Sequence, residues 1–457
     1  MEHVHLAMLV SDWLIYGLLA LAVIAFFYMR KQPHLREPWR RVAKNKLGMM
    51  AFVVLSCYVM VGLVDSIHVR IEDTQNQYSV TKTKSLLDII LSPLVIKDEK
   101  TYSSPLATHL HSQSLITTPS GKQVRGYPEL QHTKNKDIEW RVVFGVIEGL
   151  AFLLVIIGLG LLIQRIKTKR SMKKLMSLFF KGQTDVAWRE MAIAFGLVSI
   201  VFFVVGNVGW SYHIFGTDKV GQDVFYQSMK SIRTGLMIGI LTTIFMLPFA
   251  LILGMLAGYF RGWVDDLIQY AYTTLSSIPG VLLISATILV MQVYISNHPH
   301  LFPTIAERAD ARLLVLCLIL GITSWAGLCR LLRGETLKIR EMDFVSASKA
   351  LSVSNIKILF RHIMPNIMHI VLITIVLDFS GLVLAEAVLS YVGVGVDPTT
   401  FSWGNMINSS RLELAREPVV WWPLLAALIF MFVLVLAANL FADSVRDALD
   451  PRLRVKE

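Results

Sequence analysis

The sequence predicts an all-α polytopic membrane protein with about nine transmembrane helices. Of the 457 residues, 54% are hydrophobic and only 17% are charged, and the mean hydropathy is +0.57. Soluble domains carry about 45–50% apolar and about 25% charged residues, so this composition favours a lipid surrounding. The same figures exclude a disordered chain, and three cysteines exclude a disulfide-rich scaffold.

Nine apolar segments are long enough to cross a hydrocarbon core of about 30 Å, which takes about 20 helical residues. They lie at 11–29, 48–64, 142–163, 191–208, 234–258, 268–293, 311–332, 368–392 and 419–442. The first segment follows no basic stretch and has no small-residue cleavage site. We therefore expect a retained helix there rather than a cleaved signal peptide.

The distribution of charge orients these segments. The loop at 30–47 is strongly basic, and the loops at 164–190 and 330–366 also hold more basic than acidic residues. Cytoplasmic loops carry such an excess, and nine spans put all three loops on one side. This predicts a multi-pass protein whose N-terminus lies outside and whose C-terminus lies in the cytoplasm. These basic loops account for the net charge of +11, so the charge does not indicate a nucleic-acid partner.

The exported segment 65–140 is polar and holds as many acidic as basic residues. His109 and His111 are two apart and could face one side of a strand as metal ligands. No cysteine or carboxylate completes a site at useful spacing, so two solvated histidines are the simpler interpretation. We predict no metal site.

The signatures of common enzymes are absent from the sequence. There is no G-x-x-x-x-G-K-[ST] phosphate loop, no H-E-x-x-H, no G-x-S-x-G and no C-x-x-C. We expect no catalytic residue and no cofactor in this chain. The energy for transport must then come from a partner or an ion gradient.

Two carboxylates, Asp378 and Glu386, lie inside the eighth predicted span. They are about two helical turns apart and so share nearly one face. Intramembrane acids often mark proton pathways, which makes a proton-coupled secondary transporter the alternative function. The competing interpretation is that these acids bind neighbouring helices by hydrogen bonds.

The loop 333–366 is the most informative cytoplasmic element. Phe344, Ala347 and Leu351 recur with helical spacing, and Ser-Val-Ser then breaks the helix. A second amphipathic helix follows, capped by Ser354 or Asn355 and expected to stop before Pro365. Two short helices that meet at a polar turn suit docking into a groove on a soluble partner.

This loop resembles the cytoplasmic loop of ABC importer permeases, which reads E-A-A, three residues, G, and then I-x-x-x-H-x-x-P. Here Ser346-Ala347-Ser348 replaces the E-A-A and Ser352 replaces the glycine. Further segments are similar to the C-type permease subunit of dipeptide and oligopeptide importers: 36–64 loosely, and GTDKVGQDVF at 216–225, AGYFRGWVDD at 257–266, LSYVGVGVDPTTFSWGNMI at 389–407 and DSVRDALDPRLR at 443–454 more closely.

The resemblance implies a multi-pass transport subunit of the bacterial inner membrane, with a periplasmic N-terminus and a cytoplasmic C-terminus. It also implies pairing with a second homologous permease, two ATP-binding subunits and a periplasmic substrate-binding protein. ATP and Mg would be bound by the partner subunits. It also implies that the loop docks on an ATPase and couples its closure to the membrane helices. The residues carried over to this ATPase-coupling loop are Phe344, Ser346, Ala347, Ser348, Lys349, Leu351, Ser352, Ser354, Arg361, His362 and Pro365. A periplasmic motif comprises Gly216, Asp218, Gly221 and Asp223, with a role in shaping its loop or meeting the binding protein.

The family has a core of six spans, matched here by the second span and the fifth to ninth. The expected organisation is 1–47, an extra first helix with a basic loop; 48–64, the first core helix; 65–140, the periplasmic insert; 141–210, an extra hairpin; and 211–457, the main permease domain. Trp263, Trp403, Trp421 and Trp422 are expected in the interfacial aromatic belt.

Overall fold

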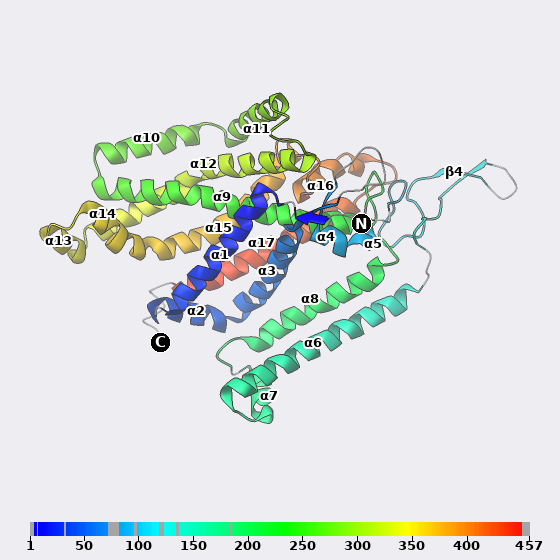
Figure 1. The fold of residues 1–457 in the computed structure, drawn as a ribbon, viewed down its shortest axis with the longest axis horizontal. Helices are drawn as coiled ribbons and strands as arrows, with labels where there is room; N and C mark the ends of the chain where they lie inside the picture. The colour runs from blue at the N-terminus through cyan, green and yellow to red at the C-terminus, as the bar shows by residue number, and fades with distance from the viewer. Residues whose placement is uncertain are drawn as a thin grey trace. The chain divides into compact units, whose positions relative to one another are not determined.

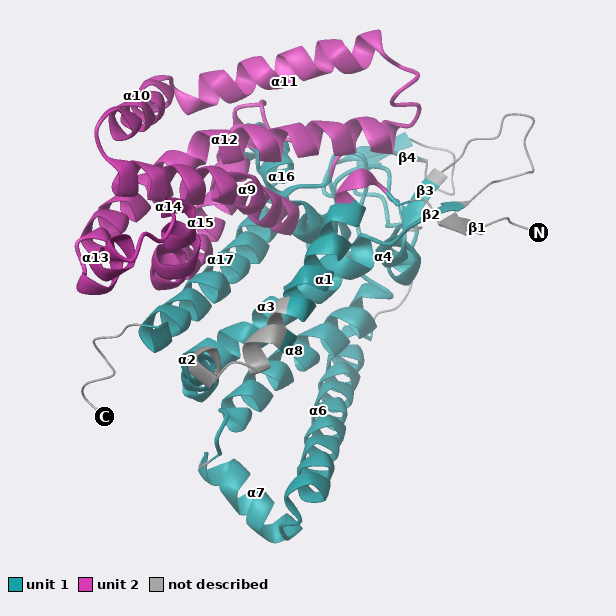
Figure 2. Ribbon diagram, turned by 60° about the vertical axis from the view of Figure 1, so that its left-hand side comes forward, with its two compact units in different colours: residues 1–8, 12–234, 401–457 teal, residues 9–11, 235–400 magenta. Residues whose placement is uncertain are grey.

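The computed structural model describes residues 4–6, 8–31, 33–71, 82–95, 98–117, 123–133, 137–182 and 184–449. It contains two compact units (Figure 2). Unit 1 comprises 1–8, 12–234 and 401–457, and unit 2 comprises 9–11 and 235–400. Residues 450–457, which end the tail motif, lie outside the described part.

Unit 1 holds the predicted extra helices and the last helix (Figure 2). Its helices are α1 (Val10–Lys31), α2 (Pro33–Lys44), α3 (Lys46–Asp65), α4 (Leu86–Ile90), α5 (Ser92–Val95), α6 (Ile138–Thr168), α7 (Met172–Lys181), α8 (Trp188–Gly209), α16 (Trp403–Ser410), the 3-10 helix η2 (Glu413–Ala415) and α17 (Trp422–Leu449). The helix α9 (Val224–Phe260) begins in unit 1 and continues in unit 2.

Unit 2 holds most of the predicted permease domain. It comprises the rest of α9, then α10 (Trp263–Ser277), α11 (Gly280–Asn297), α12 (Ile305–Arg340), α13 (Asp343–Ala350), α14 (Asn355–Ile358), the π-helical turn η1 (Leu359–Ile363) and α15 (Met364–Tyr391). A large core cluster lies in this unit, where α9, α12 and α15 bury side chains such as Ala250, Leu332 and Ile367.

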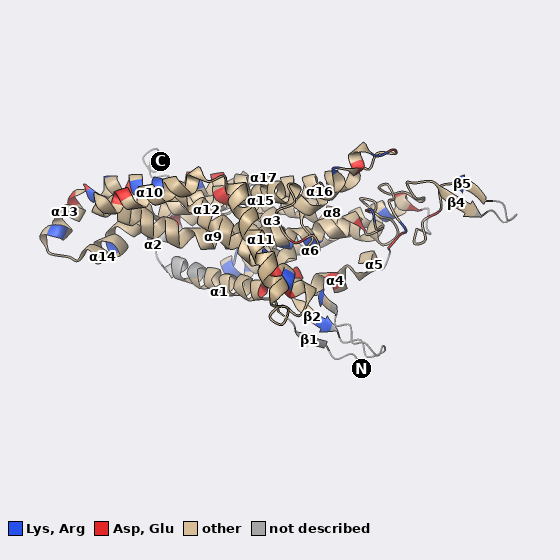
Figure 3. Cartoon of the chain, turned by 90° about the horizontal axis from the view of Figure 1, so that it is seen from above, with Lys and Arg blue, Asp and Glu red and all other residues tan. Residues whose placement is uncertain are grey.

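The fold class predicted from composition is confirmed. Within the described residues, eight helices are long and apolar enough to cross a membrane, and a shorter apolar helix lies at Val10–Ile24. Figure 3 shows the helices mostly uncharged, with Lys, Arg, Asp and Glu concentrated near helix ends and in loops. The chain is therefore a multi-pass membrane protein.

The predicted sixth span at 268–293 is wrong in its bounds. The helix breaks at Ile278, whose extended backbone (φ −83°, ψ 127°) separates α10 from α11. The cause is Pro279, which disfavours a helical conformation at the residue before it. Only α11, at 280–297, is long and apolar enough to span.

The extra hairpin of α6 and α8 is held by close backbone contact. The two helices lie side by side (Figure 1). A Cβ on Gly145 or Gly149 would overlap the backbone of Val204 or Ile200 in α8. Small residues allow such an approach between membrane helices, which lack a hydrophobic driving force in lipid.

Within the described residues, the insert at 65–140 contributes strands to two small sheets. Strands β1 (Val4–Leu6), β2 (His68–Ile71) and β3 (Lys82–Ser85) pair antiparallel, with His68 opposite Ser85. Strands β4 (Ser114–Thr117) and β5 (Gln123–Gly126) form a separate hairpin, with Ser114 opposite Gly126.

Two of the loops predicted to be cytoplasmic meet at one end of unit 1. The Ala187 amide donates to the carbonyl of Ala43 at 2.9 Å, and Arg40 forms an ion pair with Asp185 at 3.1 Å. The loops at 30–47 and 164–190 therefore lie together.

Candidate functional site

The predicted cytoplasmic loop forms two short helices joined by a tight turn. The helical run predicted at 344–351 is α13, which spans Asp343–Ala350, and Ser354 is the N-cap of α14. The expected stop before Pro365 is wrong. The chain continues through the π-helical turn η1 into α15, where Pro365 lies in the first turn. Proline is tolerated there because its missing N–H has no intrahelical acceptor.

This loop is anchored from beneath by completely buried side chains. Val345, Ile358 and Ile363 are each 0% exposed and belong to the core cluster of unit 2. Burying each such side chain contributes about 1.5–3 kcal/mol. The two short helices are therefore fixed to α9, α12 and α15.

The outer face of the loop is apolar and uncovered. Leu351 is 79% exposed, Ile356 69%, Phe360 54% and Phe344 41%. We call these four residues the docking surface. The predicted coupling residues Ser346, Ala347, Lys349, Ser352, Ser354, Arg361 and Pro365 are exposed as well, and Ser348 and His362 are half-buried. Exposed apolar side chains gathered on a fixed element are typical of a protein interface.

Tyr259 at the end of α9 holds both short helices. Its hydroxyl donates to Asn355 Oδ1 at 2.7 Å, and Arg340 Nη1 donates to its carbonyl oxygen at 2.6 Å. Lys349 Nζ lies 4.9 Å from its ring centroid. Partial burial and the neighbouring Arg340 lower the pKa of Lys349. Tyr259 belongs to the segment AGYFRGWVDD at 257–266, but its contacts could not be predicted because its partners come from distant segments.

Ser352 occupies the turn where the family pattern has glycine. Its φ is +58°, in the left-handed region that favours glycine. Its amide donates to the carbonyl of Lys349 at 2.9 Å, and the Val353 amide donates to the carbonyl of Ser348 at 3.1 Å. The serine therefore keeps the turn at the cost of backbone strain.

The two intramembrane carboxylates have different surroundings in α15. Glu386 is 1% exposed and accepts a hydrogen bond from Ser390 Oγ at 2.7 Å. Asp378 is half-buried and has no hydrogen-bond or ion-pair partner within the described ranges. Eight residues of helix separate them by about 12 Å, so no direct proton transfer joins them.

The motif at 216–225 is a rigid turn that begins α9. Asp218 accepts hydrogen bonds from the amides of Val220 and Gln222, both at 2.9 Å. Burial raises the pKa of Asp218, although hydrogen bonds from Gln227, Gln222 and Val220 oppose the shift.

Asp223 lies at the junction between this turn and α9 and forms hydrogen bonds on both sides of it. It accepts from His213 Nδ1 at 2.7 Å and from the Tyr226 amide at 3.0 Å. Gly216 and Gly221 both have positive φ, and a Cβ on them would overlap the carbonyl oxygens of Ser103 and Glu99. These contacts tie the motif to the insert.

The two histidines considered as metal ligands have separate roles. Thr108 Oγ1 lies 2.8 Å from His109 Nδ1, and the His111 ring lies edge-on to Trp422 with centroids 4.8 Å apart. No group of three residues that could hold a metal ion occurs among the described residues.

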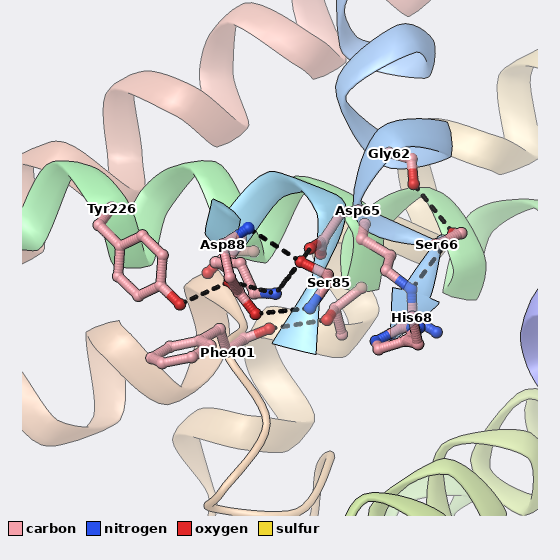
Figure 4. Close-up of polar contacts among 12 residues, drawn as sticks. Gly62, Asp65, Ser66, His68, Ser85, Asp88, Tyr226 and Phe401 are labelled. Atoms are coloured by element: carbon pink, nitrogen blue, oxygen red, sulfur yellow. Dashed lines mark hydrogen bonds and ion pairs between the residues drawn. The ribbon is translucent and has the colours of Figure 1, made fainter. Parts of the chain in front are cut away.

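A polar cluster that the sequence did not predict surrounds the first turns of α9 (Figure 4). Lys230 Nζ lies 2.6 Å from Asp65 Oδ1 and 2.9 Å from Asp88 Oδ1, and the Tyr226 hydroxyl donates to Asp88 at 2.8 Å. Burial opposes ionisation of Asp88, but Lys230 and hydrogen bonds from Ser85 and Tyr226 hold its pKa below the usual value.

A second half of this cluster lies one turn further along α9. Arg233 Nη2 lies 2.6 Å from Asp12 Oδ1, and His68 Nδ1 lies 2.8 Å from Asp12 Oδ2. Asp12 is completely buried. The signal in the sequence is the pair of basic residues Lys230 and Arg233, three apart and on one face of an apolar helix. The cluster joins α1, α3 and the insert to the permease helix α9.

The described geometry is that of a membrane transport subunit: apolar spanning helices, a fixed loop with an exposed apolar face, and intramembrane acids. Residues 250–455 match the family described as "Binding-protein-dependent transport system inner membrane component". The glutathione transport system permease protein GsiD of Pectobacterium atrosepticum is 31% identical over 245 residues, which cover 53% of this chain and 74% of that protein.

Two further relatives have similar coverage. The oligopeptide transport system permease protein OppC of Bacillus subtilis is 30% identical over 53% of this chain and 72% of its own length. The dipeptide transport system permease protein DppC of Alkalihalophilus pseudofirmus is 30% identical over 53% of this chain and 73% of its own length. This chain belongs to the family of binding-protein-dependent transport system inner membrane components, and the resemblance to ABC importer permeases is confirmed.

Proposed function

We propose that this protein is the membrane-spanning permease subunit of an ATP-driven importer for di- or oligopeptides. The observation that carries the proposal is the docking surface, whose apolar side chains are exposed while the helices that bear them are fixed by buried Val345, Ile358 and Ile363. A rigid element with an apolar face transmits the closure of a partner to the membrane helices.

Membership of the family supports the partners that we propose. A binding-protein-dependent system delivers its solute through a periplasmic binding protein, and this chain would form half of the pathway with a second permease. Two ATP-binding subunits would hold ATP and Mg, and one of them would dock on Phe344, Leu351, Ile356 and Phe360 of this chain. Relatives that carry glutathione, oligopeptides and dipeptides share the peptide bond as their common substrate chemistry.

The orientation we propose puts the docking surface in the cytoplasm. The basic loops at 30–47, 164–190 and 330–366 support this direction. The motif at 216–225 and the insert it contacts would then face the periplasm, where Gly216, Asp218, Gly221 and Asp223 shape the surface offered to the binding protein.

The test is uptake of a labelled tripeptide by proteoliposomes that contain the assembled permeases, ATPases and binding protein. Leu351→Asp and Ala347→Asp should lower uptake about tenfold or more, because a charge enters an apolar contact, while ATP hydrolysis continues. Leu412→Asp is the matched control, since Leu412 is 73% exposed and lies outside the docking surface. Normal uptake in both loop variants would contradict the coupling role.

The alternative is a proton-coupled secondary transporter that uses Asp378 and Glu386. Asp378 favours it, because a half-buried carboxylate without a partner in the described ranges suits a proton carrier. It predicts peptide uptake by the isolated chain in liposomes under a proton gradient. The importer predicts none until the ATPase subunits and ATP are added, even with both carboxylates intact.

A further inference from the structure

The short helix α7 lies at the end of the extra hairpin, where it joins the spanning helices α6 and α8 (Figure 1). The chain turns into α7 after Lys169 and out of it at Gly182, which have φ of +54° and +66°. All three helices belong to unit 1. The proposed transport function gives α7 no role.

α7 is fixed to the hairpin at both of its ends. Leu175 is 4% exposed, and Arg189 Nη1 of α8 donates to the carbonyl oxygen of Phe180 at 3.2 Å. A helix of 10 residues is marginal in water by itself, because isolated helices need about 12–15 residues. Contacts outside the helix must therefore stabilise it.

One side of α7 leaves large apolar side chains uncovered. Met176 is 44% exposed and Phe180 is 67% exposed, and their spacing of four residues puts them on one face. Trp188, the first residue of α8, is 46% exposed. Tryptophan is enriched at the boundary between a membrane and water. This face therefore suits the boundary between headgroups and acyl chains.

The exposed charges of α7 are all cationic, namely those of Lys173, Lys174 and Lys181. The segment 165–181 holds seven basic residues and no acidic one. The first acids after it are Asp185 and Glu190, which pair with Arg40 and Arg189 instead. The three lysines thus remain available to an anionic surface outside the chain.

The position of α7 identifies that surface. With 31 residues, α6 is about 46 Å long, so it extends beyond a hydrocarbon core of about 30 Å into the headgroup layer. Only three residues separate its end from the start of α7. A helix that has lysines on one side and apolar side chains on the other lies in this layer and is attracted to anionic lipids.

We propose that α7 is an interfacial helix that binds anionic phospholipids. Met176 and Phe180 enter the acyl boundary, while Lys173, Lys174 and Lys181 contact the headgroup phosphates. The extra hairpin thereby gains a function as a lipid anchor beside α3, on which α8 packs.

The test is hydrogen–deuterium exchange of residues 172–181 in the full chain, held in nanodiscs of phosphatidylglycerol or phosphatidylcholine. A lysine close to an anionic surface strengthens binding about fivefold. With three lysines, exchange should be about tenfold slower or more in phosphatidylglycerol, since a bound helix opens less often. The triple variant Lys173→Gln, Lys174→Gln, Lys181→Gln should lose most of this difference.

The matched control is the triple variant Lys84→Gln, Lys100→Gln, Lys219→Gln. These three lysines are also exposed but lie outside α7, so the variant loses the same charge and should keep the lipid difference. If it loses the difference as fully as the α7 variant, the effect is one of net charge and the proposal is wrong.

The apolar contact is tested separately. Met176→Ser with Phe180→Ser should raise exchange of α7 about threefold or more in both lipids, because insertion of apolar side chains does not depend on headgroup charge. Unchanged exchange in this variant would exclude insertion.

Three other outcomes would overturn the lipid assignment. The first is equal exchange of α7 in the two lipids. The second is protection by inorganic phosphate in phosphatidylcholine nanodiscs, which would assign the lysines to a free anion. The third is protection that appears only after the ATP-binding subunits are added, which would make α7 a protein interface.

Discussion

The ammonium of Lys349 lies 4.9 Å from the centre of the Tyr259 ring. Tyr259 also donates to Asn355 at 2.7 Å, so one side chain of α9 contacts both short helices of the coupling loop. The contact is a direct mechanical link between that loop and a helix that continues through the membrane segment. A cation over an aromatic face contributes about 0.5–1 kcal/mol at an exposed site.

Tyr259→Leu should loosen the loop more than Tyr259→Phe. The phenylalanine keeps the ring beneath Lys349 and loses only the hydrogen bond to Asn355, which costs about 1 kcal/mol. Leucine loses the cation–π contact too. Hydrogen–deuterium exchange of 343–358 should rise slightly in the first variant and strongly in the second. Phe260→Leu, at a 41% exposed neighbour, serves as the control, and equal exchange in all three variants would exclude the link.

Ser352→Gly should stabilise the protein. Ser352 has φ +58°, a conformation that costs a residue with a Cβ about 1–2 kcal/mol and glycine much less. Glycine also makes the unfolded chain more flexible, which offsets part of the gain. We expect a net gain of about 0.5–1 kcal/mol, measured as a rise in the melting temperature in detergent. Ser354→Gly, at the N-cap of α14, should give no such rise.

The fold class and the helical loop could be predicted because each rests on local pattern. The length of an apolar segment predicts a spanning helix without reference to the rest of the chain. The helical spacing of Phe344, Ala347 and Leu351 predicts α13 in the same way. The same local pattern failed at Pro279 and Pro365. The apolar segment 268–293 reads as one helix, but Pro279 divides it into α10 and α11. Proline usually ends a helix, but Pro365 lies in the first turn of α15.

The tertiary contacts could not be predicted, because they join segments far apart in the chain. Asp65 and Lys230 are 165 residues apart and meet at 2.6 Å. Trp403 and Trp422, expected in the interfacial belt, are 1% and 0% exposed. Trp422 instead donates to the carbonyl of Thr217 at 2.9 Å. Aromatic identity alone does not distinguish an interfacial ring from a buried one.

The attachment of α10 to α12 should weaken in acid. Arg333 donates to both Asp265 oxygens at 2.6 Å, and these hydrogen bonds hold the pKa of Asp265 below its usual value despite burial. Because the pKa of Asp265 is lower in the folded state, its ionised carboxylate stabilises the fold at any pH above the unfolded-state pKa of about 3.9. This stabilisation is lost as the pH falls through the folded-state pKa. Between pH 6 and pH 3, the melting temperature should therefore decrease more for the wild type than for Asp265→Asn. Parallel curves would contradict the assignment.

Gly221→Ala should prevent the motif at 216–225 from packing on the insert. Gly221 has φ +82°, and a Cβ there would overlap the carbonyl oxygen of Glu99. The backbone strain alone costs about 1–3 kcal/mol, and the overlap adds to it. Gly206→Ala in α8 is the matched control, since a Cβ there meets open space. Size-exclusion chromatography should show a loss of folded protein for the first variant alone.

Lys230→Met should destabilise the junction between the added segments and α9. Lys230 is the cation shared by Asp65 and Asp88, whose side chains are 3% and 16% exposed. Removing one partner of a buried ion pair leaves an uncompensated charge and costs about 3–5 kcal/mol. The double variant Lys230→Met, Asp65→Asn should recover part of that loss, because it removes one of the stranded charges. The melting temperatures of the two variants distinguish the effect of an uncompensated charge from a simple loss of packing. A packing defect at position 230 would persist in the double variant.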